Sequence, residues 1–333
     1  MENGTIRRIV RMYGLEAAHI FPGQKGYRNE THPVKLTDGR MVNIMLYKSE
    51  PRITELIARA NSIGAFLARS NLPVRSPADP RIVQLSHSTQ LRYASMYTYL
   101  PGKTIPWEAY TRHHIKELGR ALAELHTDLA GYDGVALPRV TDEYGAIVGR
   151  MEQYFTNAQA RQALSDKLGL SITNKVFTHI SHILAFCEKL AGQQALHMDF
   201  VRSNILFSDS HDPQIIGIID FEKAAYGHPL FDVARTLAFL LVDCKYKPAG
   251  KVRKYFLQSG YQKRGGRRLA QIAVRMSGGR RPLLEELLDL SLIYDFYKFL
   301  RHNPYEFLEQ NEHFVRTRDL LLARNVITTT SGQ

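Results

Sequence analysis

Apolar residues are spaced differently along the two ends of the chain. Before about residue 100 they occur mostly in short alternating or β-branched runs, which predict strands at 18–36 (two strands around a turn), 41–48, 82–85 and 91–100. Apolar residues at intervals of three and four predict helices at 4–13, 53–70, 112–129, 177–191, 231–242 and 283–300. The pattern therefore indicates a strand-rich N-terminal part followed by a mainly helical one, with no structure predicted for 130–170.

One short strand within the helical part ends on a carboxylate. The run IIGII at 215–219 is β-branched and bounded by polar turns, so it predicts a buried strand that delivers Asp220 at its end. Upstream lie His197, Asp199 and, five residues after Asp199, Asn204. An Asp can accept a proton from a hydroxyl, while Asn and Asp oxygens suit Mg²⁺ bound to nucleotide phosphates. These residues favour phosphoryl transfer; the alternative is two ordinary loop carboxylates beside a core strand.

The order and spacing of these residues resemble the aminoglycoside phosphotransferase and choline kinase superfamily, which has a protein-kinase-like fold. The family's loop H-G-D-x-x-x-x-N-I-L and its metal strand I-D-[FW]-E are matched by His197, Asp199, Asn204, Ile205, Leu206, Ile219, Asp220, Phe221 and Glu222. Its later motif G-x-P-x-x-D-x-A is matched by Gly227, Pro229, Asp232 and Ala234. The resemblance covers roughly residues 18–243 and is strongest over 195–235.

The resemblance implies an α+β, two-lobed protein-kinase-like fold. Its small β-rich N-lobe would comprise residues 1–102 and bind the nucleotide, and its larger, mainly helical C-lobe would comprise 103–333. The implied activity is transfer of the γ-phosphoryl group of ATP, or alternatively GTP, to a hydroxyl of a small-molecule acceptor. Asp199 would be the catalytic base, and Asn204 and Asp220 would bind Mg²⁺.

Three other polar residues near these motifs are expected to have supporting roles. His197 and Asp232 are expected to brace the catalytic loop rather than to react. His126 lies beside the apolar stripe of the predicted helix 112–129. A single histidine in such a place usually serves packing or capping, so no chemistry is assigned to it.

Two segments resemble the nucleotide-binding parts of the family. The turn FPGQKGYRNET, with Gly26 and Asn29, lies where the family has a turn over the phosphates, and glycines let backbone N–H groups approach anionic oxygens. The alternative is an ordinary hairpin. Thr98 and Leu100, in the strand end YTYLPG, lie where the family's hinge binds adenine through its backbone. The alternative there is a strand that ends in a Pro-Gly turn.

The sequence departs from the family at the phosphate-anchoring cation. The family usually has a Lys or Arg in the strand at 41–48, paired with a Glu of the following helix. The expected strand position is Met45, and the expected helix position is Ala60 or Asn61, so neither is charged. Lys48 is the nearest candidate phosphate ligand, and it could form a shifted pair with Glu55. Strand alternation places Lys48 on the opposite face from Met45, so a bulge would be needed.

The net charge of +12 is concentrated in one segment. Residues 245–281 contain twelve Lys and Arg and no Asp or Glu, so the remaining basic residues match the 32 acidic ones in number. The segment favours an anionic partner, namely RNA, a phosphorylated metabolite or an acidic membrane surface. The alternative is a solvated basic face. An anionic acceptor fits this charge better than a cationic one, although acids at Glu285, Glu286, Asp289 and Asp295 keep a cationic acceptor open.

A second class of function is a nucleotide-binding pseudokinase or an RNA-associated regulatory protein, because the strand cation is missing and the basic segment is present. Protein kinase activity is disfavoured, since no A-P-E-like segment follows Asp220. The two cysteines, Cys187 and Cys244, indicate neither a disulfide framework nor a metal site, and no apolar run is long enough to span a bilayer. We therefore expect a cytoplasmic protein, and the sequence predicts no oligomeric state.

Overall fold

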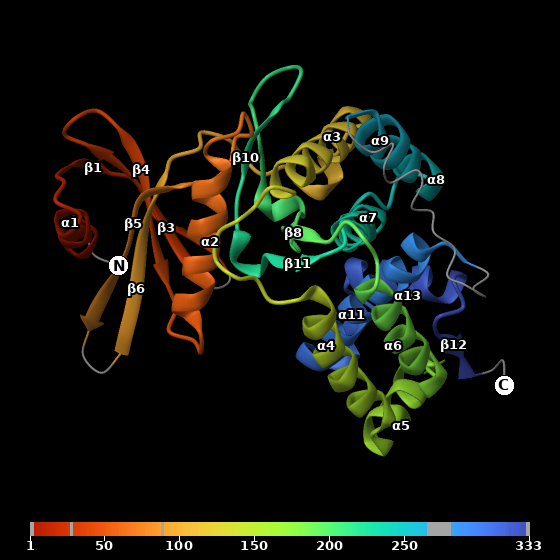
Figure 1. Ribbon diagram of the computed structural model, residues 1–333. Coiled ribbons are helices and arrows are strands. Elements are labelled where there is room, and N and C mark those ends of the chain that lie inside the picture. The colour runs from red at the N-terminus through yellow and green to blue at the C-terminus, as the bar shows by residue number, and fades with distance from the viewer. Residues whose placement is uncertain (1–2, 27–28, 88–89, 265–280, 331–333) are drawn as a thin grey trace. The chain divides into compact units, whose positions relative to one another are not determined.

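The computed structural model describes residues 3–26, 29–87, 90–264 and 281–330 (Figure 1). The chain forms two compact units, and each is described by itself. The first unit comprises Met1–Thr104, Gly131–Leu137 and Ser203–Ala224, and the second comprises Ile105–Ala130, Pro138–Arg202 and Ala225–Gln333. The first unit thus contains the predicted N-lobe together with two later segments, and the lobe boundary at residue 102 stays a prediction.

The first unit is built on an antiparallel sheet with the strand order β1–β3–β4–β6–β5, and β2 pairs with β3. Its strands are β1 (Ala17–Ile20), β2 (Gln24–Lys25), β3 (Asn29–Leu36), β4 (Met41–Tyr47), β5 (Pro77–His87) and β6 (Gln90–Thr98). Because side chains alternate along a strand, β4 supplies two cores. Ile44 and Leu46 lie in one, and Met45 and Tyr47 lie in the other.

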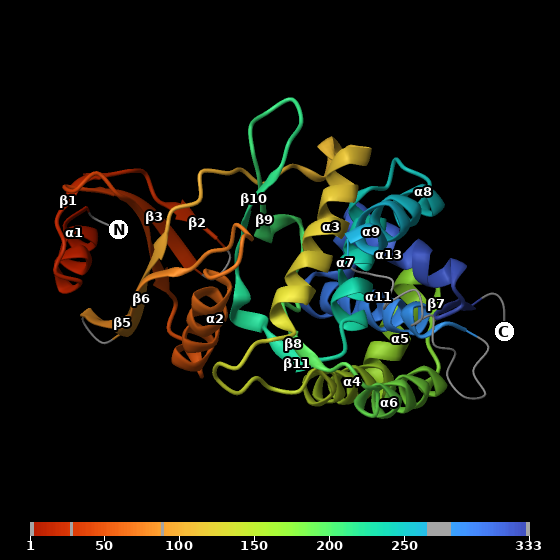
Figure 2. The same ribbon diagram turned by 45° about the horizontal axis from the view of Figure 1, so that its top comes forward.

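Two helices cover the two faces of this sheet (Figures 1 and 2). Helix α1 (Asn3–Met12) packs Ile6 and Ile9 against the face that contains Ile44. Helix α2 (Ile53–Leu67) packs Ile53 and Ile57 against the face that contains Met45 and Tyr47. Residues 53 and 57 are one helical turn apart, which explains why they reach the same face.

The first unit also contains a small two-stranded sheet. Strand β9 (Ile205–Phe207) pairs antiparallel with β10 (Ile215–Ile218). The sheet is joined to the rest of the unit at two isolated bridges, one between Val74 and Ile218 and one between Lys103 and Phe207. A 3₁₀ turn, Phe221–Lys223, follows β10.

The second unit is mainly helical. Its helices are α3 (Arg112–Leu129), α4 (Val140–Thr156), α5 (Ala158–Leu168), α6 (Asn174–Glu188), α7 (Leu230–Asp243), α8 (Ala249–Arg253), α9 (Gln262–Arg264), α11 (Leu283–His302), α12 (Tyr305–Leu308) and α13 (Glu312–Ala323). A π-helical segment, Lys254–Tyr261, joins α8 to α9. Strand β8 (Gln194–Leu196) pairs with β11 (Ala225–Gly227), and β7 (Leu170–Ser171) pairs with β12 (Thr328–Thr329). Helix α7 packs against α11 and α13, and its residues are almost all buried.

Most predicted elements are present, with ends that differ by a few residues. The helices predicted at 112–129, 231–242 and 283–300 correspond to α3, α7 and α11. Helices α4 and α5 occupy the segment 130–170, for which nothing was predicted. The apolar residues of α5 are few, since Leu164 is its one buried residue, so its sequence carries almost no helical period.

Helix α3 and the π-helical segment approach each other at two glycines. A Cβ at Gly119 would collide with the carbonyl oxygen of Phe256, and one at Gly260 would lie 2.6 Å from the carbonyl oxygen of Lys116. The missing side chains therefore set the spacing of the two helices, which carry His126 and Tyr261 respectively.

We predict that Gly119→Ala destabilises the protein, because backbone atoms would have to move to accept the methyl group. The free energy of unfolding should fall by about 1–3 kcal/mol. The matched control is Gly145→Ala on α4, where nothing lies within 4 Å of the added Cβ. That variant should gain about 0.5–1 kcal/mol, because Ala favours a helix over Gly. Denaturant unfolding of both variants checks this, and equal effects would contradict the close approach.

Candidate active site

A buried carboxylate holds the loop that carries Asp199. Asp232, near the start of α7, is 0 % exposed. Its Oδ2 accepts the N–H of His197 at 2.8 Å, and its Oδ1 accepts the N–H of Met198 at 2.6 Å. Met198 has φ 63, a left-handed conformation that side-chain-bearing residues rarely adopt. Two charge-assisted hydrogen bonds thus hold a strained residue directly before Asp199, and the bracing role expected for Asp232 is confirmed.

The same carboxylate is tied to the π-helical segment through His126. His126 Nε2 lies 3.1 Å from Asp232 Oδ2, and its Nδ1 lies 2.5 Å from the hydroxyl of Tyr261. Burial and the Asp232 charge raise the pKa of Tyr261, so its hydroxyl keeps its proton and donates to Nδ1. His126 then donates from Nε2 to the carboxylate. Sequence reasoning assigned His126 only packing or capping, yet it links Tyr261 to the catalytic loop.

Asp199 is 7 % exposed and follows strand β8 by three residues. Its N–H donates to His197 Nδ1 at 3.2 Å, so His197 also braces the loop. Arg235 of α7 is buried, and burial lowers its pKa, but Asp295, Tyr144 and Asp199 outweigh burial and raise it. Arg235 is therefore permanently charged, and Asp199 is one of the groups whose charge acts on it.

Asn204 and Asp220 lie at one end of the β9–β10 sheet in the first unit. Asn204 directly precedes β9, and Asp220 follows β10 by two residues. The strands are antiparallel, with Ile205 opposite Ile218, and the N–H of Ile219 donates to the carbonyl oxygen of Asn204 at 3.0 Å. Asp220 has φ 71 and ends the strand abruptly. The structure therefore brings Asn204 and Asp220 together, while Asp199 belongs to the second unit and is described within it.

The donor atoms at this end of the sheet fit Mg²⁺. An amide oxygen and a carboxylate are hard oxygen ligands, and Mg²⁺ commonly takes one or two protein ligands and fills its shell with phosphate oxygens and water. Asn204 is 6 % exposed, and its Oδ1 accepts the hydroxyl of Ser203 at 3.4 Å. Among the described residues no group of three His, Cys, Asp or Glu side chains forms an all-protein metal cage.

The predicted phosphate turn is connected to the segment that follows Asp220. The N–H of Gly26, just after β2, donates to the carbonyl oxygen of Asn29, at the start of β3, at 2.8 Å. Asn29 Nδ2 donates to Glu222 Oε1 at 3.2 Å. Arg59 of α2, which is 7 % exposed, donates to the carbonyl oxygens of Glu222 (3.2 Å) and Ala224 (3.1 Å). The turn and α2 thereby both fix the backbone just after Asp220.

The predicted hinge follows β6 along the chain, and backbone hydrogen bonds at its far end connect it to β9. Thr98 uses its N–H in a 2.9 Å bond to the carbonyl oxygen of Ser76, so that group is occupied. In the described part of the chain, Leu100 makes no backbone hydrogen bond, which leaves its N–H and carbonyl available to a ligand. Lys103 then exchanges two backbone bonds with Phe207. A backbone segment with free polar groups therefore lies next to the sheet that ends at Asn204.

The shifted ion pair suggested by the sequence does not form. Lys48 is exposed just after β4, whereas the Glu55 carboxylate pairs with Arg52 at 2.8 Å. The face of β4 that contains Met45 is lined by two phenols, because the hydroxyls of Tyr47 and Tyr97 lie 2.6 Å apart. Burial, as the largest cause, raises the pKa of Tyr97 to about 12. The phosphate-ligand role of Lys48 stays a prediction.

The basic segment is partly neutralised by acids from elsewhere in the chain. Of its eight described cations, four form ion pairs with carboxylates: Lys245 with Glu312, Arg253 with Glu285, Arg264 with Glu124 and Arg281 with Asp289. Arg267, Arg268, Arg275 and Arg280 lie outside the described residues. Half of the described cations are thus already paired, so the described part offers a partner less positive charge than its sequence suggests. An RNA partner stays a prediction.

The acids of α11, which kept a cationic acceptor open, are all paired within the second unit. Glu285 binds Arg253 and Arg324, Glu286 binds His179, Asp289 binds Arg281 and Arg324, and Asp295 binds Arg235 and Lys298. Burial alone would raise the pKa of Asp295, but Arg235 and Lys298 lower it. These carboxylates are committed to internal cations, so they add little attraction for a cationic acceptor.

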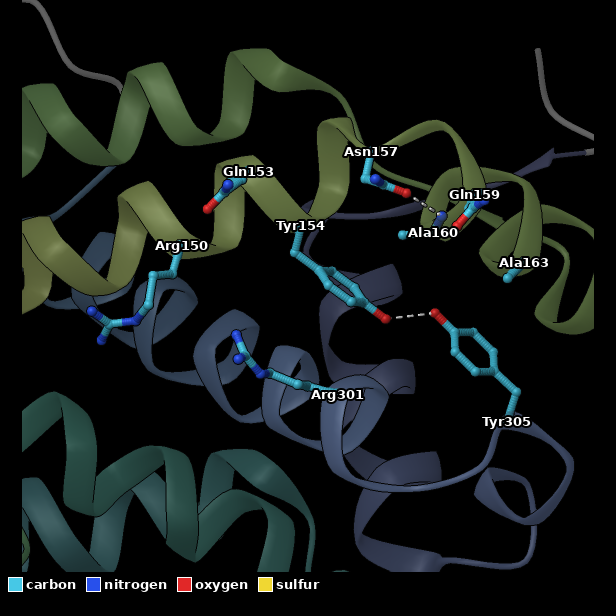
Figure 3. Close-up of a pocket in the computed structure, with 9 residues that line it drawn as sticks. All are labelled: Arg150, Gln153, Tyr154, Asn157, Gln159, Ala160, Ala163, Arg301 and Tyr305. Atoms are coloured by element: carbon cyan, nitrogen blue, oxygen red, sulfur yellow. Dashed lines mark hydrogen bonds between the residues drawn. The ribbon is translucent and has the colours of Figure 1, made fainter. Parts of the chain in front are cut away.

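A pocket of about 520 Å³ opens on the helical unit between α4, α5 and the residues around the end of α11 (Figure 3). Figure 3 shows Arg150 and Arg301 projecting from two helices, with the phenols of Tyr154 and Tyr305 joined by a 2.8 Å hydrogen bond. No carboxylate and none of the predicted site residues line it. The pocket is a surface recess with two arginines and no carboxylate in its lining, so its charge favours anions over cations.

Both cysteines are free and buried. Burial raises the pKa of Cys187 to about 12 and that of Cys244 to about 11, so neither thiol is poised for chemistry. No helix in the described ranges is long and apolar enough to cross a membrane.

Sequence reasoning missed several residues that the site depends on. Arg59 follows no family motif, and only its position in an apolar helix face, where an arginine is unexpected, could have drawn attention to it. Tyr261 lies in the basic segment, where its neighbours suggested a surface. Arg235 directly follows Ala234 of the G-x-P-x-x-D-x-A motif, so its nearness to the site could have been inferred from that spacing.

Comparisons with known proteins agree with this geometry. A model of the phosphotransferase enzyme family matches residues 22–269. Hydroxylysine kinase of Xenopus laevis is 20% identical over 264 residues, which cover 73% of this chain and 70% of that protein. Hydroxylysine kinase of Mus musculus is 26% identical over 210 residues, covering 57% of this chain and 54% of that protein.

Solved structures with the same fold include kinases of small molecules. An amicoumacin kinase in complex with AMP-PNP, Ca²⁺ and Ami has a TM-score of 0.67 at 14% identity, covering 97% of this chain and 94% of that chain. A microcompartment-associated aminopropanol kinase has a TM-score of 0.60 at 13% identity, covering 97% and 99%. The predicted α+β kinase-like fold is confirmed. Because the family model spans most of the chain, including the loop and the metal strand, the protein belongs to the phosphotransferase enzyme family of small-molecule kinases.

Proposed function

We propose that the protein transfers the γ-phosphoryl group of ATP to a hydroxyl of a small molecule, with Asp199 as the catalytic base. The observation that carries the proposal is the convergence of Asn204 and Asp220 at one end of the β9–β10 sheet. Paired oxygen ligands at a strand end suit a metal–nucleotide complex. GTP is the alternative donor, since the hinge would contact the base through backbone groups, of which the N–H and carbonyl of Leu100 are available and the Thr98 N–H is not.

The residues divide the work of phosphoryl transfer. Asn204 and Asp220 would hold Mg²⁺, and the metal would supply positive charge against the phosphates. Gly26 and Asn29 would position the turn over the phosphates, and Leu100 would offer backbone groups to the base. Asp199 would orient the acceptor hydroxyl and take its proton. Positioning and charge stabilisation account for most of the rate in such reactions.

The acceptor is best matched by a small molecule that carries an anionic group beside its hydroxyl. The α11 acids are paired within the chain, so they offer little attraction to a cationic acceptor. The names of the two curated relatives point to a hydroxylated amino acid, which has a carboxylate as well as ammonium groups. Phosphate-transfer assays on hydroxylysine, hydroxy acids, choline and aminoglycosides, with ATP and GTP, would identify the class. Cytoplasmic location and oligomeric state stay predictions.

We predict that Asp199→Asn lowers kcat at least about 100-fold, the usual contribution of a positioned base, while nucleotide affinity stays within about twofold. Asp166→Asn, which removes an exposed carboxylate from α5, is the matched control and should keep full activity. Coupled-assay kinetics and calorimetric nucleotide binding check both. Turnover by Asp199→Asn equal to that of the wild type would show that Asp199 is not the catalytic base.

We predict that Asp220→Asn weakens nucleotide binding only when Mg²⁺ is present. The wild-type protein should bind ATP more tightly with Mg²⁺ than with EDTA, and the variant should lose most of that difference. Asp209→Asn is the control, since this exposed residue of the loop between β9 and β10 forms a surface ion pair with Lys103. A variant that keeps the full Mg²⁺ dependence would remove Asp220 from the metal site.

We predict that Tyr261→Phe lowers kcat, because His126 loses the partner of its Nδ1 and holds Asp232 less firmly. The free energy of unfolding should also fall by about 1–3 kcal/mol, the cost of an unpaired buried polar atom. Tyr255→Phe, on the same π-helical segment, is the control because only its ring is in contact, with Arg112. KM should change little in either variant. Equal kcat values for the two variants would show that the brace does not act on catalysis.

A further inference from the structure

An arginine from another segment reaches the place where the family's strand cation is missing. Met45 occupies that strand position, and its Sδ lies 3.7 Å from Nη1 of Arg75. Arg75 lies between α2 and β5, thirty residues further along the chain than Met45. Both residues belong to the first unit. A guanidinium therefore stands beside a position at which the family resemblance leads one to expect a charged side chain.

Arg75 is held in place from two directions. Its backbone N–H donates to the carbonyl oxygen of Ile218 at 2.8 Å, and Ile218 precedes Asp220 by two residues. Its Cζ lies 5.6 Å from the ring centroid of Tyr97, within the range of a cation–π contact. The charges of Arg75 and Glu222 both act on the pKa of Tyr97, so the guanidinium lies in the electrostatic neighbourhood of the segment after Asp220.

The charge of Arg75 has no carboxylate partner among the described residues. Its side chain is half-buried, and the one hydrogen bond found for it goes to the Met45 sulfur, a weak acceptor. A guanidinium has five N–H donors, and only one of them has this weak contact. The donors and the charge of Arg75 are thus left for an anion.

Buried polar atoms without partners surround the same face of β4. Both polar side-chain atoms of Asn61 lack a partner, and the residue is 7 % exposed. Asn61 follows Ile53 and Ile57 at intervals of four on α2, so it shares the helix face that packs against Met45. Asn43 Oδ1, two residues before Met45 on β4, is also buried and unpartnered. Buried polar groups normally find partners, so a water or ligand oxygen belongs beside this face.

We propose that Arg75 binds the nucleotide phosphates in place of the family's strand lysine, with Asn61 in place of the helix glutamate. This inference rests on the proposed function. A guanidinium can bind two phosphate oxygens at once, and it stays charged in a half-buried site. A lysine at position 45 would need an acidic partner on α2, whereas Arg75 is fixed by its backbone bond and by Tyr97, so a neutral Asn61 is sufficient.

Calorimetric binding of AMP-PNP and of adenosine, both with Mg²⁺, tests the proposal on the full-length protein. Arg75→Met should weaken AMP-PNP binding by about 10- to 100-fold, the value of a charge-assisted contact, while adenosine affinity changes by less than about twofold. Arg75→Lys keeps the charge but loses the bidentate geometry, so it should give an intermediate affinity and serves if Arg75→Met folds poorly. Arg69→Met, which removes an exposed cation at the end of α2, should bind both ligands as the wild type does.

The outcomes separate this inference from the proposed function. If the wild-type protein binds neither AMP-PNP nor its guanosine counterpart, the proposed function falls and the inference with it. If the wild-type protein binds AMP-PNP and Arg75→Met binds it equally well, the inference alone is overturned. Lys48→Met is the competing variant: loss of AMP-PNP affinity there, with Arg75→Met unaffected, would assign the phosphates to Lys48 instead.

Discussion

The candidate site depends on one carboxylate that does not react. Asp232 is fully buried, and its two oxygens accept the N–H groups of His197 and Met198 and face His126. A buried carboxylate costs several kcal/mol unless its charge is met by donors, and here the donors are the loop itself. The N–H groups of the loop therefore stabilise the buried charge of Asp232 on α7. This reciprocity explains how Met198 keeps a backbone conformation that would otherwise relax.

The sequence predicted those elements whose apolar period or motif spacing is complete within a few neighbouring residues. The β10 run and the α3, α7 and α11 stripes each carry their period within a few residues, and the H-x-D and D-x-A motifs keep their spacing. Contacts between distant segments are a different matter. The bonds from Arg59 to Glu222, 163 residues apart, and from His126 to Tyr261, 135 residues apart, depend on packing that no single window records. Within 130–170, α5 buries too little to show a period, whereas α4 does carry an apolar stripe at helical spacing, which sequence reasoning missed.

Charge shows the same limit of sequence reasoning. A window of 245–281 without acids looks like a surface for anions, but four of its eight described cations meet acids from α3, α11 and α13 in space. The pairing works in both directions, since it also removes the α11 carboxylates from any role with a cationic acceptor. Surface pairs of this kind contribute little to stability, about 0–1 kcal/mol each, so their main consequence is for the field around the molecule. Net charge counted along the chain therefore says less about partners than the charge left after internal pairing.

In the first unit, the cost of an unpaired buried charge explains why the two departures from the family pattern, at Met45 and Asn61, occur together. A lysine at position 45 would place an ammonium on the buried face that contains Tyr47 and Tyr97, and it would need a carboxylate on α2 to offset its desolvation. With Met45 and Asn61 that face carries no charge of its own, and the cation enters from the edge through Arg75, whose backbone is already bonded to β10. A guanidinium is more weakly hydrated than an ammonium and can lie against the Tyr97 ring, so its burial costs less. The strand lysine and its acidic partner are therefore absent together, because either residue alone would be an unpaired buried charge.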